Sequence, residues 1–120
     1  PCIETHYAMI GMATVVGGYP LYYEATNEKG YSIAGLNFPH NAHYFPVSDN
    51  KENLAPFELI PWMLGQFTSV DEVKEKLNKI NIADINFNES FKTYFAHDSV
   101  SAYDICLFRT NGRTIKSVIC

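Results

Sequence analysis

A four-residue turn between two strand-like runs constrains the fold of this chain more than any other feature. The turn reads Asn27-Glu28-Lys29-Gly30 and separates residues 21–26 from residues 31–36. Glycine takes the left-handed backbone conformation at no steric cost, so Gly30 suits the closing position of a short hairpin loop. The two runs are therefore predicted to pair as antiparallel strands.

The second of these strands ends at a polar residue that local packing does not require. Asn37 comes directly before Phe38 and Pro39. Proline holds the residue before it extended and lacks a backbone N–H, so it interrupts the ladder of a sheet. We therefore expect Asn37 at a strand exit, with its backbone N–H and side-chain amide available for binding or catalysis.

Apolar patterning predicts the elements on either side of this hairpin. Residues 7–16 are nearly all apolar, which favours a strand covered on both faces and completes a three-strand meander. A buried helix is expected within residues 56–67, where Pro61 predicts a kink or a delayed start. A second helix, apolar on one side, is expected over residues 69–80 and begins with a capping box formed by Ser69 and Glu72.

Two further strand signals follow the helices. Residues 82–87 alternate between apolar and polar side chains, and residues 105–110 and 114–119 flank the turn pair Asn111-Gly112. Strands, then helices, then strands, without a regular alternation, predict an α+β domain. We expect an antiparallel sheet with two packed helices.

The composition argues against several classes of partner. The formal charge is -4 and no cluster of Lys and Arg occurs, so nucleic acid is not an expected partner. No apolar run reaches the roughly 18 residues of a spanning helix, so no membrane partner is expected. The three cysteines, Cys2, Cys106 and Cys120, are too widely spaced for a disulfide framework or a Cys-x-x-Cys site. They indicate a reducing compartment, and we expect a cytoplasmic protein.

Two other groups of residues are candidates for chemistry. His40 and His43 lie three apart, but neighbouring prolines disfavour the helix that would align them, so solvated histidines are favoured over a metal site and no cofactor is expected. Cys2 would gain its own α-amine as a general base only if Pro1 were removed. A cysteine without function near a chain end is the simpler interpretation.

Several separated motifs resemble one known family. In chain order they are Tyr7-Ala8-Met9-Ile10-Gly11-Met12, Tyr19-Pro20-Leu21-Tyr22-Tyr23, Asn27-Glu28-Lys29-Gly30, Ala34-Gly35-Leu36-Asn37-Phe38-Pro39, Pro56-Phe57-Glu58-Leu59-Ile60-Pro61-Trp62 and Ser69-Val70-Asp71-Glu72-Val73. In their order and spacing they resemble the choloylglycine hydrolase family, which contains the bile salt hydrolases and penicillin V acylases. The resemblance covers about residues 6–91.

The resemblance implies an N-terminal nucleophile hydrolase with a four-layer αββα sandwich. In such an enzyme an N-terminal cysteine attacks the amide of a glycine- or taurine-conjugated bile acid, its α-amine acts as base, and two asparagines hold the oxyanion. Asn37 matches the first oxyanion position, where a backbone N–H is the donor, and is the catalytic candidate. By the same resemblance Val16, Tyr23, His40 and Phe45 lie in segments that border the substrate. Asparagine at position 37 favours a bile salt hydrolase over a penicillin V acylase-like amidase.

The chain also departs from the family pattern. The family opens with its nucleophilic cysteine and a Gly-Arg-Asn-x-Asp segment that has no counterpart here, and residues 92–120 have no convincing match. We therefore expect residues 1–120 to form a single partial domain that is inactive alone. The alternatives are a non-catalytic truncated product, an interaction module completed by a complementing chain or a second copy, and a cysteine hydrolase that uses Cys2.

Overall fold

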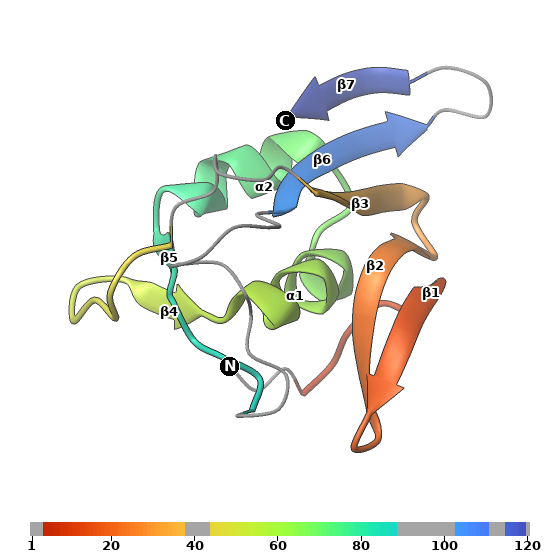
Figure 1. The fold of residues 1–120 in the computed structure, drawn as a ribbon. Helices are drawn as coiled ribbons and strands as arrows, with labels where there is room; N and C mark the ends of the chain where they lie inside the picture. The colour runs from red at the N-terminus through yellow and green to blue at the C-terminus, as the bar shows by residue number, and fades with distance from the viewer. Residues whose placement is uncertain (1–3, 38–43, 89–102, 111–114, 120) are drawn as a thin grey trace.

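The described residues, 4–37, 44–88, 103–110 and 115–119 of a computed structural model, contain a five-stranded antiparallel sheet (Figure 1). Its strands are β1 (Met9–Val16), β2 (Tyr19–Asn27), β3 (Tyr31–Asn37), β6 (Tyr103–Thr110) and β7 (Ile115–Ile119). They lie in the order β1-β2-β3-β6-β7, and every neighbouring pair is antiparallel. The predicted meander and the predicted second hairpin are both confirmed.

The turn between β2 and β3 forms as its sequence indicates. Gly30 has a φ of 77°, in the left-handed region, and its N–H donates to the Asn27 carbonyl at 2.9 Å. The Asn27 side-chain oxygen accepts two more N–H groups from the same turn, those of Lys29 and Tyr31, each at 3.0 Å. The turn is thus closed by both the backbone and the side chain of Asn27.

The first helix begins late, as Pro61 predicts. A 3₁₀ turn, Pro56–Glu58, leads into α1 (Leu59–Gln66), so Pro61 falls within the first turn of the α-helix. N–H groups there have no partner within the helix, so proline costs no hydrogen bond. Most of α1 is buried, in agreement with its apolar sequence.

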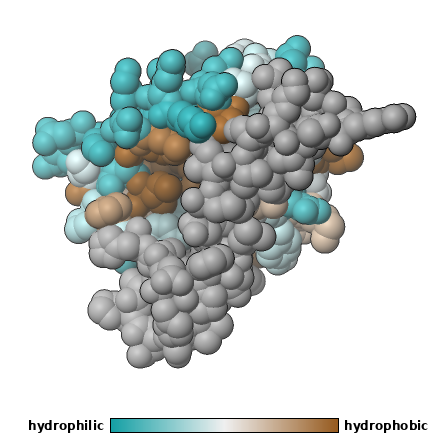
Figure 2. Space-filling model, turned by 90° about the horizontal axis from the view of Figure 1, so that it is seen from above, coloured by the Kyte–Doolittle hydropathy of each residue, from teal (hydrophilic) through white to brown (hydrophobic). Residues whose placement is uncertain are grey.

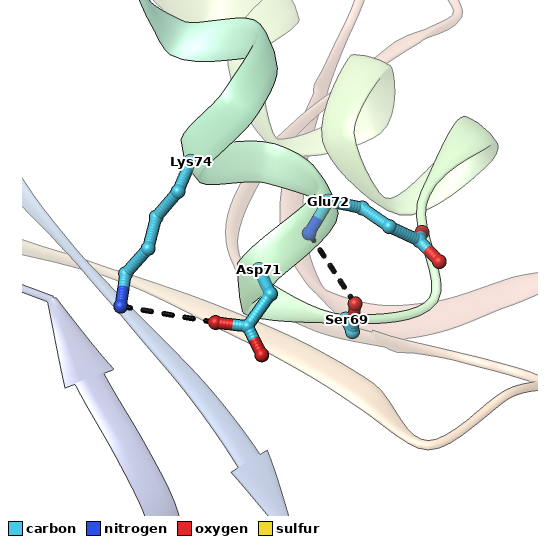
Figure 3. A network of polar contacts seen from close by, with 4 residues as sticks. All are labelled: Ser69, Asp71, Glu72 and Lys74. Carbon is cyan, nitrogen blue, oxygen red and sulfur yellow. Dashed lines mark hydrogen bonds and ion pairs between the residues drawn. The ribbon is translucent and has the colours of Figure 1, made fainter.

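The second helix, α2 (Val70–Leu77), starts at the predicted cap. The Glu72 N–H donates to the Ser69 hydroxyl oxygen at 3.4 Å (Figure 3). The Glu72 carboxylate reaches one residue further back than a capping box requires, because it accepts from both the N–H and the hydroxyl of Thr68, at 2.8 and 2.9 Å. Neither of the α-helices in the described part of the chain is long and apolar enough to cross a membrane.

The prediction of a strand over residues 82–87 is wrong in its position. The structure instead has β5 (Ile80–Ile82), which pairs in parallel with β4 (Glu52–Leu54) in a small second sheet. Beyond β5 the pairing continues, within the described residues, as an isolated bridge between Ala83 and Phe45. Parallel pairing with β4 buries Ile80 and Asn81. The alternation of side chains within residues 82–87 could not predict this pairing, because β4 lies in a distant part of the sequence.

The hydrophobic core lies between one face of the large sheet and the two helices (Figure 1). It is built from Ala25, Tyr31, Ile33, Leu54, Leu59, Ile60, Trp62, Met63, Leu64, Phe67, Val70, Val73 and Ile80. Helix α1 packs on β2 and β3. Strand β1 lies at the edge of the sheet, and its Ile10 and Met12 side chains are 80% and 63% exposed. The expectation that this strand is covered on both faces is therefore wrong for this structure.

Candidate functional site

The orientation of the Asn37 backbone follows from a hydrogen bond at the other end of β3. The Tyr31 N–H donates to the Asn27 side chain, so it points toward β2. The N–H groups of alternate residues in a strand point to the same edge. Asn37, the last residue of β3, is six residues after Tyr31, and its N–H therefore also faces the β2 edge.

That edge of β3 is open where Asn37 lies. The register between β2 and β3 runs from the Thr26–Ser32 pair to the Glu24–Ala34 pair, and in the described residues it gives Asn37 no partner in β2. On the opposite edge β6 continues the pairing as far as Asn37, which faces Tyr103. Asn37 is the last residue of β3, as expected of a strand exit, but its pairing with β6 was not foreseen. Its N–H nevertheless faces away from β6.

Two of the predicted substrate residues lie on the β1–β2 hairpin. Val16 is half-buried opposite Tyr19 at the closed end of the hairpin. Tyr23 is the extra residue of a β-bulge, because the register passes from Met12–Glu24 directly to Ala13–Tyr22. Bulges re-aim side chains and bend strands. The Tyr23 ring is about half exposed, and its hydroxyl is hydrogen-bonded to the Thr14 hydroxyl.

Phe45, the third described candidate, lies beside the small sheet. Its N–H donates to the Ile82 carbonyl at 3.1 Å, and its carbonyl accepts from the Asp84 N–H at 2.9 Å. The small sheet and the β1–β2 hairpin lie on opposite sides of α1 (Figure 1). Phe45 is bonded to the segment that follows β5, and the Phe87 ring of that segment lies 5.5 Å from the ring of Tyr19, which pairs with Val16. His40 falls outside the described residues.

An aromatic cluster near the start of β2 was not foreseen from the sequence. Tyr19, Phe57 and Phe87 have ring centroids 5.1 to 6.0 Å apart, and two of the three pairs meet edge to face. Burial raises the pKa of the Tyr19 hydroxyl above its ordinary value, and the nearby Glu58 and Tyr22 add to the effect. Three aromatic residues from separate segments carry no local signal that predicts their contact.

The second unforeseen residue is Asn27, whose side chain is 4% exposed. Its amide nitrogen donates to the carbonyls of Leu64 and Phe67, at 2.9 and 2.8 Å. The last carbonyls of a helix lack partners within the helix, so Asn27 satisfies the end of α1 from the neighbouring hairpin. The turn signal located Asn27 but gave no indication of this second role.

The described part of the site offers hydrogen-bond donors and apolar surface. No group of three or more His, Cys, Asp or Glu side chains that could hold a metal ion occurs in the described ranges. A backbone N–H held at the open edge of a sheet is suited to bind an anionic oxygen, since it is fixed in direction. The exposed Tyr23 and Phe45 rings are suited to bind an apolar group.

Comparison with known proteins assigns the family. Residues 1–104 match the profile described as linear amide C-N hydrolases, choloylglycine hydrolase family. The bile salt hydrolase/transferase of Lactiplantibacillus plantarum is 55% identical over 87 residues, which cover 72% of this chain and 27% of that protein. The conjugated bile acid hydrolase of Lactobacillus acidophilus is 45% identical over 102 residues, which cover 83% of this chain and 32% of that protein.

A solved structure agrees with the sequence relatives. A variant of conjugated bile acid hydrolase from Clostridium perfringens has a TM-score of 0.73 and 30% identity, covering 98% of this chain and 36% of that chain. The expected N-terminal nucleophile hydrolase fold is thereby confirmed. The chain spans between 27% and 36% of the lengths of these three relatives. By its sequence and its fold, the chain belongs to the choloylglycine hydrolase family.

Proposed function

We propose that this chain supplies an oxyanion donor and part of the substrate pocket for hydrolysis of the amide bond in glycine- or taurine-conjugated bile acids. The names of the relatives, bile salt hydrolase and conjugated bile acid hydrolase, support the reaction and the substrate class. The observation that carries the proposal is the Asn37 N–H, which faces the open edge of β3.

The proposed chemistry needs a fixed donor. Attack of a thiolate on the amide carbon breaks the carbonyl π bond and leaves negative charge on the oxygen, which the Asn37 N–H would stabilise. One such donor typically contributes about 10² to 10³ in rate. Val16, Tyr23, His40 and Phe45 are proposed as contacts to the bile acid. We propose that the nucleophile that the family resemblance implies, an N-terminal cysteine with a free α-amine, is supplied from outside this chain.

A pair of substitutions at one position tests the donor. Proline at position 37 removes the N–H, whereas alanine retains it; because the N–H faces away from β6, proline should leave the β3–β6 pairing intact. The chain is assayed with glycocholate and taurocholate, alone and with the remaining part of the Lactiplantibacillus plantarum relative supplied as a second polypeptide. We expect no turnover alone, turnover with the second polypeptide, a loss of about 10² or more for Asn37→Pro, and a much smaller loss for Asn37→Ala.

Other outcomes select the alternatives. Turnover by the chain alone that disappears in Cys2→Ala would establish a cysteine hydrolase that uses Cys2. Faster hydrolysis of penicillin V than of either bile acid conjugate would assign a penicillin V acylase-like amidase. Equal losses in Asn37→Pro and Asn37→Ala would show that the side chain, and not the N–H, is what the reaction needs.

A second candidate function is association through β1. This strand lies at the edge of the described sheet, and its Ile10 and Met12 side chains are largely exposed. Figure 2 shows a small area of apolar surface at the right-hand edge of the molecule and a larger one nearer the centre. An edge strand with apolar side chains pairs readily with another strand, from a second copy or a complementing chain.

Sedimentation of the purified chain tests this association. We expect oligomers that dissociate in Met12→Lys, because a lysine on an edge strand opposes further pairing. Glu24→Lys serves as a control, since it adds the same residue to the neighbouring strand β2. A wild-type chain that is monomeric with a cooperative thermal transition would overturn the association.

We also propose a cytoplasmic location. It is supported by the wide spacing of Cys2, Cys106 and Cys120 along the chain, which suits a reducing compartment. Fractionation of cells that express the chain would test it, and recovery in a secreted or envelope fraction would contradict it.

A further inference from the structure

Two asparagine side chains fasten residues 45–48 to the small sheet. The Asn53 side-chain oxygen accepts from the Ser48 N–H at 2.8 Å, and its nitrogen donates to the Ser48 carbonyl at 2.7 Å. The Asn81 nitrogen donates to the Pro46 carbonyl and to the Asn53 side-chain oxygen, both at 2.8 Å. We refer to Asn53 and Asn81 as the amide clamp.

The clamp fixes the backbone on which Phe45 lies. Phe45 is itself bonded to Ile82 and Asp84 through its backbone, so the clamp and these two bonds hold the segment at both ends. Asn81 is 8% exposed. Burying an amide costs free energy unless its donors are hydrogen-bonded. The clamp is therefore restricted to the arrangement in which both hydrogen bonds of Asn81 form. The Phe45 side chain is nevertheless 52% exposed. An apolar ring is thus held at the surface by a rigid polar support.

We propose that Asn53 and Asn81 are positioning residues that hold Phe45 for contact with the apolar part of the substrate. The inference rests on the proposed function, in which Phe45 contacts the steroid of a conjugated bile acid. Neither asparagine is assigned a contact with the substrate. They act by removing the conformational freedom that Phe45 would otherwise lose on binding.

The hydrogen bonds predict a larger effect of the same substitution at position 81 than at position 53. Asn53 accepts two hydrogen bonds and donates one, so Asn53→Asp retains both acceptor contacts and loses only the bond to the Ser48 carbonyl. Asn81 only donates in this network, so Asn81→Asp loses both contacts and places a carboxylate against the Pro46 carbonyl oxygen. Both variants add the same charge. Asn50→Ala, at an exposed residue just after residues 45–48, is the control.

Amide hydrogen exchange measures the positioning directly. We expect the Phe45 and Asp84 N–H groups to exchange about tenfold faster or more in Asn81→Asp, less so in Asn53→Asp, and at the wild-type rate in Asn50→Ala. Exchange in α1 reports whether the fold survives. Unchanged exchange at Phe45 in Asn81→Asp, with α1 intact, would overturn the proposal.

Binding of taurocholate, followed by NMR shifts with and without the complementing polypeptide, tests the consequence for substrate. We expect Phe45→Ala and Asn81→Asp each to weaken binding about tenfold, and the double variant to bind no more weakly than Phe45→Ala. A role of Asn81 that does not act through Phe45 would instead make the two losses additive, and would overturn the proposal. Absence of wild-type binding contradicts the proposed function itself, whereas binding that is insensitive to the clamp contradicts only the positioning role.

Discussion

The backbone N–H of Tyr31 donates a hydrogen bond to the side-chain oxygen of Asn27, 3.0 Å away. The nitrogen of the same buried amide donates to the Leu64 and Phe67 carbonyls at the end of α1. One side chain therefore closes the β2–β3 turn and joins it to the first helix. The same bond shows that the Tyr31 N–H, and with it the alternate N–H groups of β3 as far as Asn37, points toward β2.

Asn27→Ala should destabilise the fold by about 3 kcal/mol, because it leaves two carbonyls and two N–H groups without their partners. Urea unfolding followed by the fluorescence of Trp62, which is buried in α1, measures the loss. Asn50→Ala, at an exposed position, should change stability by less than about 0.5 kcal/mol. Equal unfolding midpoints for the two variants would contradict the assigned role of Asn27.

Tyr31→Phe should leave stability unchanged or raise it by about 1 kcal/mol at neutral pH. The Tyr31 side chain is fully buried, and its hydroxyl has no hydrogen-bond partner among the described residues. Removing the hydroxyl therefore breaks no described hydrogen bond and relieves the desolvation of a polar group. Urea unfolding at pH 7 measures the change, and a loss of more than about 1 kcal/mol would indicate a partner for the hydroxyl.

The same tyrosine predicts a loss of stability at alkaline pH. Burial raises the pKa of the Tyr31 hydroxyl above its ordinary value of 10.0, and the nearby Glu72 carboxylate adds to the shift. Because the folded-state pKa is the higher one, stability is fully present below pH 10 and falls as pH rises above it. The slope should be about 1.4 kcal/mol per pH unit for one proton. Tyr31→Phe should remove this loss, whereas Tyr23→Phe, at a half-exposed residue, should retain it.

The sequence predicts those elements whose signals are local. The turn at Gly30, the cap at Ser69 and the delayed start of α1, at Leu59, each depend on the backbone preferences of a few adjacent residues, and all three are confirmed. The pairing of β5 with β4 is different, because the two strands are separated by both helices. Alternation within residues 82–87 indicated a strand but could not show which residues would find a partner.

In the candidate site, too, the local features were predicted from the sequence and the contacts between distant segments were not. The position of Asn37 at the end of β3 follows from the proline two residues later, but its neighbour β6 comes from a distant segment. Likewise, turn chemistry located Asn27 without revealing that its amide caps α1. Contacts between distant segments are determined by the packing of the whole core, so no local sequence pattern predicts them.

The N-terminus of α2 should lose stability when its cap is removed. Ser69→Ala removes the acceptor of the Glu72 N–H (Figure 3). Glu72→Ala removes the carboxylate that accepts from Thr68. Each should cost about 1 kcal/mol, measured by thermal unfolding. The Asp71–Lys74 ion pair, which starts in the same first turn, is exposed and 3.9 Å long, so Asp71→Asn should cost less than about 0.5 kcal/mol. A larger loss for Asp71→Asn than for Ser69→Ala would contradict this ranking.

Gly11→Ala should separate β1 from β2. A Cβ at position 11 would lie 2.5 Å from the Cβ of Ala25 and 2.7 Å from its Cα, and would also overlap the Glu24 carbonyl oxygen. Backbone atoms cannot yield as a flexible side chain does, so we expect a cost of more than about 2 kcal/mol. Hydrogen exchange should show faster exchange along β1 and unchanged exchange in α2. Val15→Ala, which shortens an exposed side chain of the same strand, is the control and should leave exchange in β1 as it is. Protection of β1 that survives Gly11→Ala would mean that the two strands approach less closely than the structure shows.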